Sequence, residues 1–178
     1  DNKYDKRFKY YMGVDWGQSN DYTVLTIMRT DTHRVEYIDR FNQIGWQVQR
    51  DRLLALHNKW NCRLILAEAN SIGSVNIEAL QTLKGSNGKY LPVRSFMTTL
   101  DSKIEIIQEL SLAFEQGSVE IPDYAPLIDE LGAYEATRLS SGKWSYSAPI
   151  GGHDDTVMSL AIVHHAVLHH AFRDVLMV

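Results

Sequence analysis

The sequence predicts an α/β fold in which a mixed sheet, three antiparallel strands followed by parallel strands, carries helices on both faces. The first quarter of the chain contains three β-rich runs with short, turn-prone connections, the pattern of an antiparallel meander. Beyond residue 45 the apolar residues adopt helical spacing, and helices alternate with short buried strands. This alternation predicts parallel strands joined by crossover helices.

The three antiparallel strands are expected at 10–15, 22–30 and 34–41. The second and third runs are rich in β-branched and aromatic residues, which favour strands. The turn-prone residues 31–33 separate them, and the first run is a short apolar segment that ends in Asp15. The segments that follow are helices at 46–60, 74–83, 103–114, 123–136 and 156–172, strands at 62–67 and 90–96, and a hairpin whose turn is 140–143.

The chain has 178 residues, of which 44% are hydrophobic, enough for one domain with a sizeable core. A single cysteine, Cys62, excludes a disulfide framework and a cysteine-rich zinc site. No apolar run approaches the roughly 20 residues of a membrane span, so no membrane partner is expected. The formal net charge of −4 weighs mildly against nucleic-acid binding, although a site built of carboxylates lowers this count until cations fill it.

Acidic residues stand where an apolar segment ends or begins. Asp15 and Glu68 each end an apolar strand, and the pair Asp154–Asp155 precedes the last helix. Each strand-end acid alone could face solvent or cap a turn, and a helix start accommodates one acid as an N-cap. Two adjacent acids exceed what capping requires. Clustered carboxylates need cations, and hard oxygen ligands suit Mg²⁺ or Mn²⁺.

Three motifs together resemble a known family. They are YYMGVDWGQSNDYTVLTIM, LILAEANSIG and GGHDDTVMSLAIV, and they resemble the nuclease domain of bacteriophage large terminase subunits over residues 10–170. The resemblance implies a ribonuclease H-like fold for residues 10–178, with residues 1–9 as the stub of an interdomain linker. The family's ATPase motor needs a GxxxxGK[ST] phosphate loop, which this sequence does not contain.

The resemblance also implies roles for the acids. Asp15, Glu68 and Asp155 would be catalytic, with Asp15 shared by two Mg²⁺ or Mn²⁺ ions and Glu68 completing one of the two sites. Asp155, helped by Asp154, would complete the other. Asp21 matches an additional family acid that can face the metals, and it is equally well explained as a turn residue before the second strand.

The implied activity is endonucleolytic cutting of double-stranded viral DNA concatemers during genome packaging, in the cytoplasm of the infected bacterial host. The implied partners are double-stranded DNA, the ATPase motor domain of the same full-length chain, the portal and the small terminase subunit. A Holliday-junction resolvase or transposase-like nuclease of the same fold is the alternative. An actin- or sugar-kinase-like ATPase is a weaker one, because it needs two lobes and further phosphate loops.

Four basic residues are candidates for contacting DNA. Arg138 and Lys143 lie on the expected hairpin just before the catalytic helix, although a plain surface hairpin explains them as well. His153 adjoins the paired acids and could touch a phosphate or serve only in a turn. Lys103 opens an amphipathic helix, where a phosphate contact competes with an ordinary surface position.

The adjacent acids are expected to differ in role. Successive side chains of a helix point about 100° apart, so Asp154 and Asp155 cannot face one metal equally. We expect Asp154 to cap the helix by accepting from the backbone N–H of Thr156 or Val157, and Asp155 to be the direct ligand. His165 and His169 have the i, i+4 spacing of metal ligands, but no acid lies near them in sequence, so a surface role at the helix end is expected.

Overall fold

A computed structural model describes residues 4–171 and shows a five-stranded mixed sheet in the order β3-β2-β1-β4-β5. Strand β1 (Tyr10–Asp15) pairs antiparallel with β2 (Thr23–Arg29), which pairs antiparallel with β3 (Arg34–Phe41). Strands β4 (Leu64–Glu68) and β5 (Val93–Phe96) continue the sheet parallel to β1. The predicted mixed sheet is confirmed.

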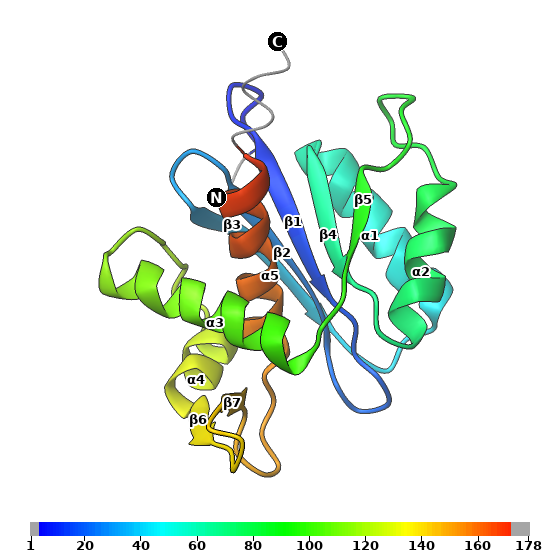
Figure 1. Ribbon diagram of the computed structural model, residues 1–178. Coiled ribbons are helices and arrows are strands. Elements are labelled where there is room, and N and C mark those ends of the chain that lie inside the picture. Colours follow the sequence, from blue (N-terminus) through cyan, green and yellow to red (C-terminus); the bar gives the residue numbers. More distant parts are fainter. Residues whose placement is uncertain (1–3, 172–178) are drawn as a thin grey trace.

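Helices cover both faces of the sheet, as predicted (Figure 1). One face packs against α1 (Trp46–Trp60) and α2 (Ile72–Gln81). The other packs against α3 (Leu100–Glu115), α4 (Ala125–Ala133) and α5 (Asp155–His170). Because strand side chains alternate between faces, β1 sends Tyr10, Met12 and Val14 toward the first core and Tyr11 toward the second.

The order of all the predicted elements is confirmed, and most boundaries differ by a few residues. The helix expected at 123–136 ends at Ala133, because Glu135 and Ala136 pair with Ser147 and Tyr146 in the hairpin. This hairpin joins β6 (Glu135–Arg138) to β7 (Trp144–Ser147). The strand expected at 90–96 begins only at Val93, just after a proline that cannot donate a backbone hydrogen bond.

Parts of two sequence expectations lie outside the described residues. The proposed linker stub 1–9 includes residues 1–3, and the expected last helix includes residue 172. Within the described range, Phe8 packs beneath the Arg29 guanidinium at 3.6 Å from the ring centre. No helix of residues 4–171 is long and apolar enough to cross a membrane.

Candidate metal centre

Strand periodicity sets the two strand-end acids on one face of the sheet. Gly13 pairs with Leu66 and Val14 with Ala67, so the next step along these parallel strands brings Asp15 beside Glu68. Leu66 packs in the core beneath α5, and Glu68 stands two positions further along the same strand. Side chains two apart share a face. Both carboxylates therefore project from adjacent central strands toward the side covered by α5.

Helix α5 lies close to β1 because β1 has a glycine at the crossing point. A Cβ atom at Gly13 would lie 2.5 Å from the carbonyl oxygen of Ser159 and 2.7 Å from the backbone nitrogen of Val163. The Ser159 hydroxyl donates to the Gly13 carbonyl at 3.0 Å, which fixes the helix against the strand. This close approach places the first residue of α5, Asp155, at the end of β1 where Asp15 lies.

Asp15 is buried among the carboxylates, and its pKa reflects it. Burial raises the pKa of Asp15 well above its usual range, and the charge of Glu68 and a hydrogen bond with it raise it further. Asp155 and Asp154 add smaller contributions in the same direction. An ionised carboxylate in such a place is costly unless a cation or a proton accompanies it. The donors are all hard oxygens, a set that fits Mg²⁺ or Mn²⁺.

Asp155 is held by backbone and surrounded by further ligand atoms. Its Oδ2 accepts from the backbone N–H of Tyr22 at 3.1 Å and lies 3.7 Å from His153 Nδ1. His153 Nδ1 is in turn 3.5 Å from Asp21 Oδ1. One ligand atom from each of Asp21, His153 and Asp155 lies within 4.8 Å of the others, so the structure brings the β1–β2 loop to the same cluster.

The expectation that the Asp154 side chain caps α5 is wrong. Asp154 occupies the N-cap position, but its side chain makes no capping hydrogen bond. Its Oδ2 instead lies 3.1 Å from Lys103 Nζ and accepts from the Tyr134 hydroxyl at 3.5 Å. The Lys103 ammonium is a stronger partner for the Asp154 carboxylate than a backbone N–H of α5 would be, because a charge-assisted hydrogen bond is stronger than one from a neutral N–H. Asp154 thus ties α3 and α4 to the start of α5 at the edge of the acidic cluster.

The cap of α5 comes from Glu130 on α4. Its Oε2 accepts from the backbone N–H of Thr156 at 2.8 Å and of Val157 at 3.3 Å, and from the Thr156 hydroxyl. Arg40 Nη2 lies 3.8 Å from the other carboxylate oxygen, Oε1. A buried carboxylate at a helix N-terminus satisfies free N–H groups and suits the helix dipole. Glu130 therefore fixes the turn that carries Asp155, a role that no local sequence pattern indicates.

We expect Glu130→Gln to lower the free energy of unfolding by about 1–2 kcal/mol, the usual worth of a cap with its charge. Asp154→Asn should change stability less, because the amide oxygen can still accept from Lys103 and Tyr134 while the repulsion with Asp15 is removed. Thermal unfolding of both variants in EDTA measures the difference, with Asp129→Asn on the exposed side of α4 as the control. A larger loss in Asp154→Asn than in Glu130→Gln would contradict this assignment.

The raised pKa of Asp155 predicts how stability and metal affinity depend on pH. Burial raises this pKa to about 6, and Asp21, Glu130 and Asp154 add to the rise, against the bond from Tyr22. The folded chain thus binds this proton more tightly than the unfolded chain, so its metal-free stability should fall as pH rises from about 4 to about 6. Metal ligands must lose their proton, so metal affinity should rise over the same range.

Melting temperatures with EDTA and with Mn²⁺, measured from pH 4 to pH 8, test this directly. The gain produced by Mn²⁺ should be large at pH 8 and small at pH 5. Asp155→Asn should reduce the fall in metal-free stability between about pH 4 and pH 6, while Asp15, whose pKa is also raised, still contributes to it. An equal Mn²⁺ gain at both ends of the range would show that no titrating carboxyl controls binding.

The four basic residues expected to contact DNA fall into two pairs, one beside the acidic cluster and one on the hairpin. His153 and Lys103 contact the acidic cluster itself, through Asp155 and Asp154. Arg138 lies exposed on β6, and Lys143 in the hairpin turn pairs with Asp101 of α3 at 2.6 Å. The hairpin is thereby held against the helix that also carries Lys103.

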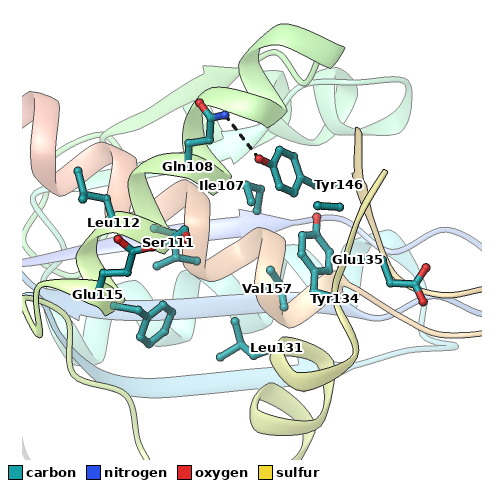
Figure 2. A pocket seen from close by; sticks show the side chains of 13 residues that line it. Ile107, Gln108, Ser111, Leu112, Glu115, Leu131, Tyr134, Glu135, Tyr146 and Val157 are labelled. Atoms are coloured by element: carbon teal, nitrogen blue, oxygen red, sulfur yellow. Dashed lines mark hydrogen bonds between the residues drawn. The ribbon is translucent and has the colours of Figure 1, made fainter. Parts of the chain in front are cut away.

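A groove of about 380 Å³ separates this hairpin from α3 and α4. Figure 2 shows its mixed apolar and polar lining, in which Tyr146 points toward Gln108, and the Gln108 Nε2 lies 3.5 Å from the Tyr146 hydroxyl. Burial, and next the charge of Asp154, raises the pKa of Tyr134, so its hydroxyl stays protonated and donates to that carboxylate. Among residues 4–171, the groups able to hold a metal lie outside this groove.

Comparison with known proteins gives relatives of one kind. No family model matches the chain. The large terminase subunit of Thermus phage G20c is 33% identical over 155 residues, which are 87% of this chain and 31% of that protein. The large terminase subunit of Thermus virus P23-45 matches equally. The chain thus spans about a third of the length of these relatives.

Comparison with solved structures gives the same kind of relative as the sequence comparison. The large terminase nuclease from thermophilic phage G20c with bound magnesium superimposes with a TM-score of 0.80 at 28% identity, covering 92% of this chain and 84% of that one. The large terminase nuclease domain of bacteriophage SPP1 with bound manganese has a TM-score of 0.62 at 13% identity and shares the fold. The predicted ribonuclease H-like fold and the resemblance to phage terminase nuclease domains are confirmed.

Proposed function

We propose that this chain, a homologue of phage large terminase subunits with the fold of their nuclease domain, is a metal-dependent endonuclease that cuts double-stranded viral DNA concatemers during genome packaging. One observation carries the proposal: the Asp15 carboxylate is buried next to Glu68, and the charges of Asp155 and Asp154 act on it as well. Among residues 4–171 no ion pair with a basic side chain offsets the charge at Asp15, and divalent cations would do so.

We assign the ligands to two ions, Mg²⁺ or Mn²⁺. Asp15 would bridge both, Glu68 would hold one, and Asp155 would hold the other with help from Asp154 and Asp21. Such ions, when bound, activate a water and stabilise the leaving oxygen in attack on a phosphodiester. The chain supplies rigid placement: the Tyr22 N–H orients Asp155, and Glu130 holds its helix turn.

Asp154 has a separate task in this proposal. Lys103 Nζ contacts it and so offsets part of the negative charge at the edge of the cluster. The same ammonium is placed to contact a phosphate, as is His153. We therefore expect Asp154→Asn to retain partial activity and Asp155→Asn to have none, because Asp155 is the more buried acid and raises the pKa of Asp15 more, whereas Asp154 pairs with Lys103.

The proposal is tested by incubating the chain with supercoiled plasmid and Mn²⁺ or Mg²⁺, with a four-way DNA junction as competitor. Nicked and linear products that require the cation support an endonuclease of double-stranded DNA. Cleavage undiminished by excess EDTA would contradict the proposal. Preferential cutting of the junction would favour the resolvase alternative.

The hairpin gives a prediction about DNA binding. Replacing both Arg138 and Lys143 with Ala should weaken binding of duplex DNA and make it less dependent on salt. Each phosphate contact that is lost reduces the number of counterions released when the chain binds DNA. Binding titrations at several salt concentrations, in Ca²⁺ to limit cleavage, measure both effects. Replacing Lys84 and Lys89, which lie beside α1 and α2, is the matched control. Unchanged affinity and salt dependence in the hairpin variant would remove the hairpin from the interface.

The remaining expectations concern the larger protein. The curated relatives are about three times longer than this chain, so we place the domain 10–178 after an ATPase motor, with residues 1–9 as the stub of the connecting linker. The portal and the small terminase subunit would be its packaging partners, in the cytoplasm of the infected host. These assignments rest on the kinship with large terminase subunits.

A further inference from the structure

A second group of metal-ligating side chains lies between α3 and α5, away from the acidic cluster. Glu109 of α3 faces two histidines one turn apart on α5. Its Oε2 is 2.8 Å from His165 Nδ1, and its Oε1 is 2.6 Å from His169 Nε2. His165 lies ten residues after Asp155, which places this group about 15 Å further along the helix. It is therefore separate from the candidate metal centre.

The three side chains meet the geometric needs of a small ion. One ligand atom from each lies within 4.8 Å of the other two. A tetrahedral zinc ion with bonds of about 2.0–2.2 Å sets its ligands roughly 3.3 Å apart, so small side-chain rotations suffice. The ring of Phe96 meets His165 edge-on at 5.6 Å and limits its orientation.

Placement and access also favour an ion. Glu109 presents one carboxylate oxygen to each imidazole, so all three side chains converge on one point between α3 and α5. Glu109 and His165 are largely buried, whereas His169 is 47% exposed. The group is thus open on one side, where an ion can enter and keep a water as its fourth ligand.

We propose that Glu109, His165 and His169 form a structural site for a divalent transition-metal ion such as Zn²⁺, which joins α3 to the last turn of α5. Two imidazoles and one carboxylate suit Zn²⁺, Ni²⁺ or Co²⁺, whereas Mg²⁺ favours sites made of oxygens alone. The chain would then carry two classes of metal site. This proposal does not depend on nuclease activity.

The test is calorimetric titration of the chain with ZnCl₂ in the presence of excess Mg²⁺, which occupies the carboxylate centre. Zn²⁺ can still compete for that centre, so the measured quantity is the difference between matched chains. His169→Asn should bind one equivalent less than the parent chain, or bind it at least about tenfold more weakly. Glu109→Gln, which preserves side-chain shape, should behave alike, and His170→Asn, outside the group, should match the parent.

Thermal unfolding supplies the second measurement. Zn²⁺ should raise the melting temperature of the parent and of His170→Asn more than that of His169→Asn, because an ion that binds only the folded chain stabilises it. Circular dichroism in EDTA checks that each variant is folded; His169 is half exposed, so its replacement should be tolerated. Equal Zn²⁺ stoichiometry and affinity in parent and His169→Asn would overturn the proposal, as would a parent chain that binds no Zn²⁺ under these conditions.

Discussion

Replacing Asp15 with Asn is expected to abolish cation-dependent cleavage of plasmid DNA while raising the melting temperature of the metal-free chain. Asp15 is buried, and its pKa is raised by burial, by Glu68 and by the paired acids of α5. The amide keeps the size of the side chain and removes the charge, so it relieves the repulsion that no cation offsets. The same change removes the proposed ligand shared by both ions. Loss of activity should therefore accompany a gain in stability.

Plasmid cleavage with Mn²⁺ and thermal unfolding in EDTA measure the two effects. Each kcal/mol gained would raise the melting temperature by about 2–4 °C in a domain of this size. Asp51→Asn is the matched control, because Asp51 is exposed on α1 and accepts a hydrogen bond from Gln47 one turn earlier on the same helix. A melting temperature many degrees lower in Asp15→Asn would instead identify Asp15 as a structural residue.

The second large effect is expected at Gly13, where Ala should destabilise the fold and also weaken metal binding. The added Cβ would meet the backbone of α5 at Ser159 and Val163, at 2.5 and 2.7 Å. Backbone atoms cannot rotate away, so the helix must shift. Overpacking of this kind costs about 2–3 kcal/mol, equivalent to a fall of about 5–10 °C in melting temperature. A displaced α5 also moves Asp155 away from Asp15, so Mn²⁺ affinity should fall as well.

Gly132→Ala on α4 is the matched control, because a Cβ there meets nothing within 4 Å. Alanine is favoured over glycine in a helix by up to about 1 kcal/mol, so this variant should be neutral or slightly more stable. Thermal unfolding and Mn²⁺ titration of both variants complete the comparison. A Gly13→Ala chain with parental stability would show that β1 and α5 can separate at no cost.

Local sequence patterns predict the fold and much of the acidic cluster. The change from strand to helical periodicity predicts every element of the sheet and its helices, because each segment spaces its apolar residues with the period of its own backbone. The strand-end positions of Asp15 and Glu68 follow from the same alternation. These features depend on neighbours within a few residues, which a single sequence displays.

What escaped prediction depends on residues distant in sequence. The α5 cap comes from Glu130, which is 26 positions away from Thr156 in another helix, while the local capping pattern indicates Asp154. Lys103 is 51 positions from Asp154, and Glu109 is 56 positions from His165. Only the packing of α3 and α4 against α5 brings these groups together. A single sequence contains no signal for such pairings.

The docking of α5 on β1 also determines when the acidic cluster can form during synthesis of the chain. The bond between Ser159 and Gly13 joins positions 146 residues apart, and a ribosome adding about 5–20 residues per second needs on the order of ten seconds to cover that distance. Asp15 and Glu68 are both synthesised well before their partner on α5, Asp155. A nascent chain therefore lacks the complete acidic cluster until its final helix emerges, and a chain truncated before that helix could not assemble it.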